Sequence, residues 1–461
     1  MAENNSVVLL RKTIEGDDFV DACNEEDATV ICVNRETKNR KLMSFRILYQ
    51  NNKKFWLQNE VWEYFLSGEV LQKIRERMSP QQPGQGYVAA DKPGSAAVQD
   101  GYGNEYEAIA AMSDKERVEH IKKSKERLDQ LILQKPRQEN LVTEALVETA
   151  RDTIMYNYAT IMGVMNLSND EAKKHTQDLV DSTYDLVKSS TNLISTNLFN
   201  DELMNTLVAK SNGTIIQHMT RTHLNGLAFL SYYNSLVSSS SAINKLRINF
   251  AKKYRSFYQR LLPDVDEEKI TLEKVFHGGM RAIPEADFYN WAVGFLVHDI
   301  GKAAAVEYHE GETAYNRDIV IEHVSVGYNS VMNKTNYPRD VGLITGYHHE
   351  YYGNQDGYGY FRLYLDQYKK LNPRVKQGFC IAFEFAPMMD CEALAFFPAK
   401  VLEIIDVFDS LTDPNRKYRK PLTTDEALAM MQEEFINKYP KLDVIIFDIF
   451  SQFIKDISIE H

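Results

Sequence analysis

The spacing of apolar and polar residues predicts a chain built mainly from helices, with a short mixed segment at its start. Between Val7 and Met78, brief apolar runs such as ATVICV and KLMSFRILY precede a helical-looking stretch that begins at Trp56. Short apolar runs are typical of strands, and a longer patterned stretch favours a helix. Residues 1–78 are therefore predicted to form a small α/β or α+β module, whose role (sensing, partner docking or dimer formation) the sequence leaves open.

The next segment, residues 79–112, has no hydrophobic periodicity. It is rich in Gly, Pro, Ser, Ala and Gln, as in SPQQPGQGYVAADKPGSAA. Such a composition cannot bury an apolar face and is typical of flexible linkers. We predict a linker here.

Residues 113–210 return to a helical pattern. Leu128, Leu131 and Ile132 fall on one helix face at three- and four-residue spacing, and Pro136 is expected to interrupt the pattern once. These helices are interpreted as a signalling stalk, a dimerisation bundle that would make the protein a homodimer, or part of the downstream core. The sequence alone does not choose between these three.

From residue 211 to residue 461 the pattern stays mostly helical, and histidines and aspartates gather beside apolar segments. Neutral imidazoles and carboxylates suit iron, manganese or zinc, and this set exceeds what one four-coordinate ion can use. A pair of neighbouring metal ions would use it fully. The candidate ligands are His223, His298, Asp299, His323, His348, His349 and Asp406.

Composition narrows the classes of function. The formal net charge of -12 argues against a surface for polymeric nucleic acid, because phosphate contacts need clustered Lys and Arg. No basic-then-apolar leader and no run of eighteen apolar residues is present, so a cytoplasmic protein without a membrane span is predicted. The four cysteines form no CxxC pair, which predicts free thiols.

From about Thr220 to the end, the chain resembles the HD-GYP family, the branch of the HD phosphohydrolases that cleaves cyclic di-GMP. The motifs that carry the resemblance are Thr220 to His223, HDIGK at His298 to Lys302, His323 with Gly327, HHE at His348 to Glu350, DVFDSLT around Asp406, and RKYRK at Arg416 to Lys420. The resemblance implies an all-helical HD-type domain over residues 211–461.

The resemblance also implies a chemistry. The seven candidate ligands would hold two divalent transition metals, with iron or manganese expected. Asp299 would bridge the two ions, and a metal-bridging hydroxide would attack phosphorus. Lys302 would act with Asp299 as a catalytic residue, placing an ammonium beside a phosphate oxygen. A third ion, held in some relatives by a glutamate one turn before the first histidine, is not expected, because that place is Met219 here.

The chain departs from the family in its substrate loop. The family's DGxGYP ends here with Phe361 in place of proline, and three extra residues separate HHE from DG. The segment between Tyr360 and Asp406 is also longer than usual. The residues expected to bind substrate are Lys302, Asp356, Gly357, Tyr358, Gly359, Tyr360, Arg416 and Arg419.

Several assignments keep an alternative. His218 competes with His223 as the first ligand, and His223 is preferred because Thr220 precedes it. Asp409 would orient a ligand histidine or be a surface charge. Arg416 and Arg419 would form a phosphate clamp or a solvated face. Tyr358 and Tyr360 would stack on guanine or only pack.

The predicted function is hydrolysis of cyclic di-GMP to pGpG, and the sequence leaves open whether pGpG or GMP is the final product. One alternative is a phosphohydrolase for another cyclic dinucleotide or a nucleotide monoester. The other is a module that binds cyclic di-GMP or a protein without turnover. A complete ligand set disfavours the last, because a binding module has no need of seven metal-binding groups.

Overall fold

The computed structural model divides the 461-residue chain into two compact units, residues 1–94 and 95–461. It describes residues 7–10, 19–20, 22–23, 28–34, 40–51, 62–67, 70, 74, 109, 111–135, 138–194, 215–304, 317–352, 357–374, 376–414 and 420–459. Apart from Ile109, Ala111 and Met112, the predicted linker therefore lies outside the described residues.

The first unit contains an antiparallel sheet in the order β1-β4-β2-β3. The helix α3 (Phe45–Asn51) follows the edge strand β3 directly in the chain. Its strands are β1 (Val7–Leu9), β2 (Thr29–Asn34), β3 (Arg40–Ser44) and β4 (Trp62–Ser67). β2 pairs with β3 from Thr29 opposite Ser44, and with β4 from Ile31 opposite Phe65.

The helix expected from Trp56 is wrong over β4. Tyr64 and Leu66 are buried while Phe65 between them is partly exposed, which is the two-residue period of a strand. Aromatic residues favour strands, and pairing with β1 and β2 overrides the weak helical pattern. Val30, Cys32 and Leu66 are fully buried in the core of this unit.

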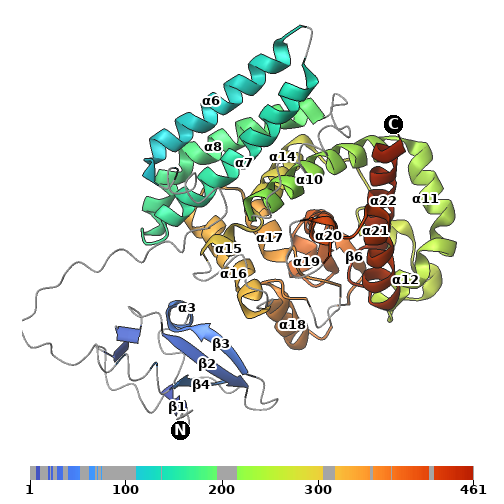
Figure 1. Cartoon of the computed structure of the whole chain (residues 1–461). Coiled ribbons are helices and arrows are strands. Elements are labelled where there is room, and N and C mark those ends of the chain that lie inside the picture. Colours follow the sequence, from blue (N-terminus) through green and yellow to red (C-terminus); the bar gives the residue numbers. More distant parts are fainter. Residues whose placement is uncertain are drawn as a thin grey trace, which may run out of the picture. The chain divides into compact units, whose positions relative to one another are not determined.

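The second unit is mainly helical, as predicted (Figure 1). Its longer helices are α6 (Asp114–Leu133), α7 (Glu139–Gly163), α8 (Asn169–Leu193), α10 (Ile215–Ser238), α11 (Ser240–Lys253), α12 (Arg255–Leu261), α14 (Glu285–Val297), α15 (Ile300–Ala304), α16 (Arg317–Lys334), α17 (Arg339–Tyr347), α18 (Arg362–Leu371), α20 (Phe397–Thr412), α21 (Thr424–Gln432) and α22 (Val444–Ile459). The remaining helical segments are η2 (Glu267–Lys269), α13 (Leu272–Val275), α19 (Ala386–Met389) and η3 (Glu433–Lys438).

The expectation of an all-helical domain needs one correction. Three short parallel strands, β5 (Phe276–His277), β6 (Phe379–Ala382) and β7 (Ala393–Phe396), form a sheet in that order. β6 and β7 lie in the long segment between Tyr360 and Asp406. Both strands are short, apolar and largely buried. Their sequences therefore lack the alternation of apolar and polar residues that would predict a strand.

The helices α6, α7 and α8 lie side by side (Figure 1) and share a core with the helices that follow. Leu146 and Ile154 of α7 belong to the same buried cluster as Leu224 and Phe229 of α10. Thr176 of α8 also donates to the carbonyl of Lys334 at 3.0 Å. These contacts place α6, α7 and α8 in the same core as the helices from α10 onward.

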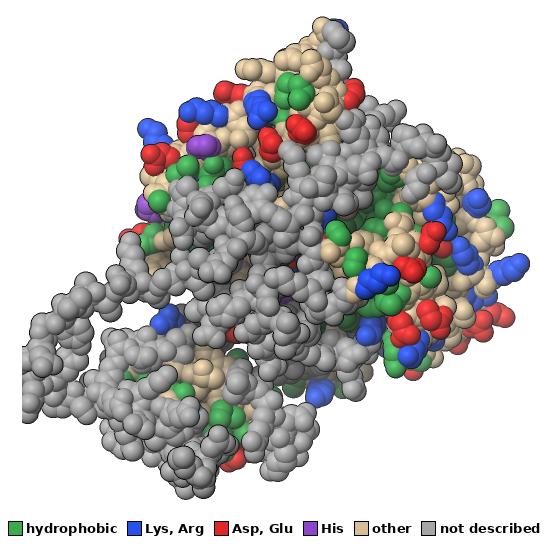
Figure 2. Space-filling model, in the orientation of Figure 1, with side chains coloured by type: hydrophobic (Ala, Val, Ile, Leu, Met, Phe, Trp, Pro, Cys, Tyr) green, Lys and Arg blue, Asp and Glu red, His purple; other side chains and the backbone are tan. Residues whose placement is uncertain are grey.

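The described surface carries charges of both signs. On the face shown in Figure 2, Lys and Arg side chains are interspersed with Asp and Glu, which is typical of a solvated surface. Among the described helices, none combines the length and the apolar composition that crossing a membrane requires. All four cysteines are free and buried, as the sequence predicted.

Candidate metal centre

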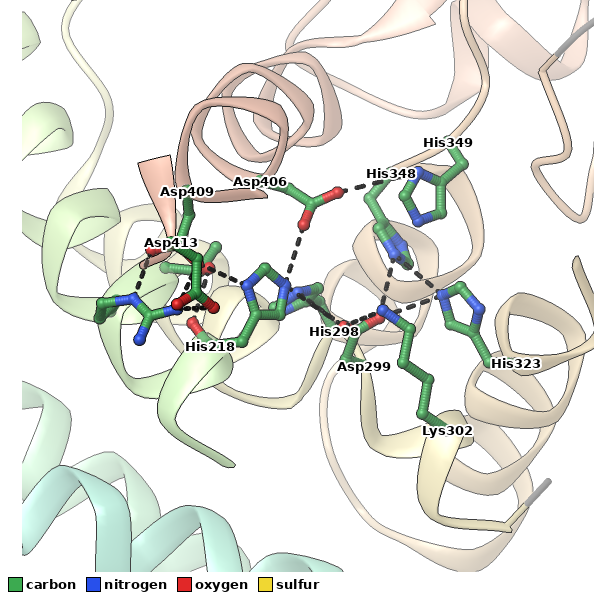
Figure 3. A network of polar contacts seen from close by, with 12 residues as sticks. His218, His298, Asp299, Lys302, His323, His348, His349, Asp406, Asp409 and Asp413 are labelled. Atoms are coloured by element: carbon green, nitrogen blue, oxygen red, sulfur yellow. Dashed lines mark hydrogen bonds and ion pairs between the residues drawn. The ribbon is translucent and has the colours of Figure 1, made fainter. Parts of the chain in front are cut away.

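Seven buried side chains converge from separate elements at the centre of the second unit (Figure 3). They form two groups, and within each group the potential ligand atoms lie within 4.8 Å of one another. The first group is Asp299, His323, His348 and His349, and the second is His218, His298 and Asp406. α10, α14, α16, α17 and α20 supply these residues or end directly before them.

Two of the histidines end helices and are oriented in the same way. His298 follows α14, and its Nδ1 donates to the carbonyl of Phe295 at 2.9 Å. His348 follows α17, and its Nδ1 donates to the carbonyl of Thr345 at 2.8 Å. Because the other ring nitrogen is then the acceptor, each imidazole presents Nε2 to the site. The apolar helix α14 therefore ends directly before His298 and Asp299, and its position places both side chains at the polar centre.

Asp299 lies between the two groups, with one carboxylate oxygen facing each. Its Oδ1 is 3.1 Å from His323 Nε2 and 3.6 Å from His348 Nε2. Its Oδ2 is 3.4 Å from His218 Nε2 and 3.5 Å from His298 Nε2. A carboxylate in this position can bridge two cations, as the resemblance implied for Asp299.

Gly301 allows this arrangement. A Cβ on Gly301 would lie 1.9 Å from the carbonyl oxygen of His323 and 2.5 Å from the amide nitrogen of Gly327. Only a residue without a side chain lets the backbone of α15 approach α16 so closely. The glycine of HDIGK thus brings His323 against Asp299.

The assignment of His223 is corrected by the structure, which places His218 at the site instead. His218 Nε2 is 2.9 Å from Asp406 Oδ1. His223 is buried elsewhere, and its Nδ1 donates to the carbonyl of Ala292 at 3.0 Å, between α10 and α14. Five residues along a helix is about 1.4 turns, so the two histidines face different directions and only one can reach the centre.

Asp409 orients His218, which is one of the two roles that the sequence allowed. His218 Nδ1 donates to Asp409 Oδ2 at 2.7 Å, which leaves Nε2 toward Asp299 and Asp406. Sequence reasoning missed the partners of Asp409. Arg221 donates to both Asp409 and Asp413, and all three are buried. The signal was present in the spacing, because His218 and Arg221 lie one helical turn apart.

Three histidines of the centre, His298, His323 and His349, have pKa values suited to binding metal. Burial lowers the pKa of His298 to about 3 and that of His323 to about 4, and it lowers the pKa of His349 well below its usual value. These imidazoles are therefore neutral near pH 7, the form that ligates a cation. Burial also lowers the pKa of His218, but contacts with Asp299, Asp406 and Asp409 outweigh it and raise that pKa to about 10.

The carboxylates of the centre are ionised. Burial would raise the pKa of Asp299, but Lys302 and the neighbouring histidines hold it well below the usual value. Burial likewise opposes ionisation of Asp406, and His218 and His349 outweigh it. Each aspartate can thus offer an anionic oxygen to a cation.

The donor set fits a pair of divalent cations. Both ring nitrogens of His349 and the Nε2 of His298 are buried, and none of the three has a hydrogen-bond partner among the described residues. Unpartnered buried nitrogens are costly unless something coordinates them. Imidazole and carboxylate together suit iron, manganese or zinc. The buried groups could therefore hold metal.

Lys302 and the aromatic loop lie beside the first group. Lys302 Nζ donates to Asp299 Oδ2 at 2.5 Å. The ring of Tyr358 lies against that of His349, with centroids 4.3 Å apart, while Tyr360 stacks on Tyr328 at 4.9 Å. Tyr358 therefore covers a candidate ligand, and Tyr360 covers a neighbouring aromatic ring.

The loop is fixed to the histidine pair through its backbone. The amides of Tyr358 and Gly359 donate to the carbonyl of His349 at 3.0 and 3.2 Å. A Cβ on Gly359 would lie 2.1 Å from the side chain of Glu350, so that position requires glycine. Gly357 is also described and lies beside Arg362. Asp356, Arg416 and Arg419 lie outside the described residues.

Buried charges on α20 were not predicted beyond Asp406 and Asp409. Lys400 donates to Glu403 at 2.7 Å, and both are buried, Glu403 about one turn and Lys400 about two turns before Asp406. Burial raises the pKa of Glu403 to about 8 and that of Glu350 to about 7. The sequence does contain a signal for these residues. From Lys400 to Asp409 a charged residue occurs at every third position, which places the charges along one side of a helix.

No protein-family profile matches the chain, and no curated protein does so either. Among solved structures, the chain is similar to Bd1817, a HDG"Y"P protein from Bdellovibrio bacteriovorus. The match has 10% sequence identity and a TM-score of 0.37, and covers 98% of this chain and 99% of that one.

Proposed function

We propose that this protein is a metal-dependent phosphodiesterase that hydrolyses cyclic di-GMP to pGpG. The observation that carries the proposal is the position of Asp299, with one oxygen facing the histidines of each group. The HDIGK and HHE motifs support the same reaction class. Iron or manganese is the proposed metal.

The proposed ligands are the seven residues of the two groups, with His218 replacing His223. Two divalent cations bound there would supply Lewis acidity toward a phosphate and a nucleophile at neutral pH. Asp299 would hold the cations at a fixed separation. The neutral histidines would fill the remaining positions without adding negative charge beside an anionic substrate.

Other residues of this chain would bind and orient the substrate. Lys302, whose side chain is 14% exposed, would place its ammonium beside a phosphate oxygen as negative charge develops there. Tyr360, which is 40% exposed, offers a ring face on which a base can stack. Arg416 and Arg419 are proposed as a clamp on the second phosphate, on the strength of the sequence motif.

A second candidate substrate is another cyclic dinucleotide, and Phe361 favours it. Phe361 stands where the family has proline, and its ring stacks on Tyr347 at 4.6 Å and meets Phe385 edge-on at 5.7 Å. The loop is therefore held by aromatic packing rather than by a proline ring. A base pocket of altered shape follows from that difference.

The test uses the full chain, stripped with chelator and reloaded anaerobically with Mn²⁺ or Fe²⁺. Cyclic di-GMP, the mixed guanine-adenine dinucleotide and a nucleotide monoester are supplied separately, and the products are resolved by chromatography. The proposal predicts pGpG from cyclic di-GMP with loaded protein and none with stripped protein. Faster turnover of the mixed dinucleotide would select the second candidate. Tight binding without any product, at full metal content, would instead identify a binding module.

A further inference from the structure

Arg221 joins two buried carboxylates on one side of the second ligand group. Its Nε donates to Asp409 Oδ1 at 2.6 Å, and its Nη2 donates to Asp409 Oδ2 at 2.9 Å. The same Nη2 donates to Asp413 Oδ2 at 2.8 Å. Arg221 is 5% exposed, and the two aspartates are 4% and 5% exposed. This geometry is the two-pronged pairing that a planar guanidinium makes and an ammonium cannot.

The same carboxylate connects Arg221 to a candidate ligand. Asp409 Oδ2 accepts from His218 Nδ1, as Figure 3 shows, and it also accepts from Arg221 Nη2. One oxygen therefore holds both α10 side chains against α20. With Asp409 fixed at both oxygens, the imidazole plane of His218 has one orientation. That orientation places Nε2 between Asp299 and Asp406.

His218 differs from two other histidines of the centre in the kind of group that orients its imidazole. His298 and His348 donate to backbone carbonyls of the helices that they end, and those acceptors cannot rotate away. His218 lies inside α10 and donates to a side chain. Asp409 would be free to rotate if nothing held it, so the orientation of His218 depends on Arg221.

We infer that Arg221 is a positioning residue for the metal site, acting on His218 through Asp409. Asp413 completes the arrangement by accepting from the same Nη2 that donates to Asp409. The inference rests on the proposed metal pair and not on the identity of the substrate. It predicts that loss of Arg221 weakens one of the two bound ions, because Arg221 is linked through Asp409 to His218, which belongs to the second ligand group.

The experiment measures Mn²⁺ binding to the full chain by calorimetry and by electron paramagnetic resonance. Wild-type protein should bind two ions and give the spectrum of a coupled pair. Arg221→Met should bind the second ion about 10- to 100-fold more weakly and give a six-line spectrum of isolated Mn²⁺. Arg221→Lys keeps the charge but not the two-pronged contact, and should fall between the two.

Arg117 provides the matched control. It is also 5% exposed, and it pairs with Asp114 at 2.5 Å and donates to the carbonyl of Met112 at 2.6 Å. Arg117→Met therefore loses a buried arginine far along the chain from the centre. It should lower the unfolding temperature while keeping two ions and the coupled spectrum.

The outcomes separate this inference from the proposed function. Wild-type affinity for both ions in Arg221→Met would overturn the inference and leave the metal pair standing. Failure of both Arg221 variants to fold would also overturn it, since Arg221 would then serve folding alone. Absence of Mn²⁺ binding in the wild-type chain would remove the metal pair itself.

Discussion

Lys302 Nζ lies 2.5 Å from Asp299 Oδ2, so the candidate catalytic cation is paired with the carboxylate that faces both ligand groups. Lys302 is also the largest influence that keeps Asp299 ionised despite its burial. A divalent cation bound to Asp299 would compete with this ammonium for the same oxygen. The lysine is then available to meet an anionic substrate, which links metal binding to substrate binding.

Lys302→Met is expected to separate these two events. Without the competing ammonium, Mn²⁺ should bind as tightly as in the wild-type protein or more tightly. Turnover of cyclic di-GMP should fall about 100- to 1000-fold, because a preorganised charge beside the phosphate is lost. Calorimetry and steady-state kinetics on the same preparation give both values. Loss of metal from this variant would mean that Lys302 supports the site rather than the reaction.

His218 and His223 form a matched pair, since both are buried on α10. His218→Asn should lose one of two ions, because a ligand of the second group is removed. His223→Asn should keep both ions and lose only stability, by about 1–3 kcal/mol for a disturbed buried hydrogen bond. Elemental analysis and thermal unfolding of both variants provide the comparison. The reverse pattern of metal content would restore His223 as the ligand.

Tyr358 and Tyr360 are expected to differ in effect, although both belong to the same loop. Tyr358→Ala exposes His349 and should weaken metal binding, because the ring that packs against this imidazole is removed. Tyr360→Ala should raise KM about tenfold to a hundredfold at unchanged metal content, since stacking contributes about 1–3 kcal/mol per base. Measuring KM and bound metal for both variants tests the assignment. Equal KM for wild type and Tyr360→Ala would show that Tyr360 only packs against Tyr328.

Most candidate ligands of the centre could be predicted from the sequence, because they lie in short local motifs. HDIGK and HHE each place a ligand at a helix end, where one hydrogen bond to the preceding turn orients the ring. The choice between His218 and His223 could not be made in this way. It depends on which face of α10 meets α20, and therefore on Asp409, which is 191 residues away from His218.

The parallel strands β5, β6 and β7 were missed for a related reason. β5 lies about a hundred residues before its partner β6, so the pairing cannot be predicted from a local sequence pattern. The pattern over β4 also predicts a helix, because its aromatic residues fit both the helix and the strand period over a short length. Pairing with β1 and β2 makes this segment a strand. Such pairing between distant segments cannot be predicted from local sequence.

The first unit is expected to be dispensable for hydrolysis. The division of the chain at residues 94 and 95 leaves the whole centre in the second unit. A chain that begins at Ser95 should retain metal and basal turnover. One that begins at Ser113 should be less stable by about 1–3 kcal/mol, because Arg117 loses the buried carbonyls of Ile109 and Met112. If the chain from Ser95 folds and holds metal but cannot hydrolyse substrate, the first unit belongs to the catalytic machinery.

The metal content of the full chain, compared between the wild-type protein and Asp299→Ala, tests the central claim most directly. The position of Asp299 between the two groups predicts about two transition-metal ions per wild-type chain. Asp299→Ala should retain neither ion firmly and should not hydrolyse cyclic di-GMP, while remaining folded. Wild-type protein without iron, manganese or zinc, and fully active in the presence of chelator, would contradict the account.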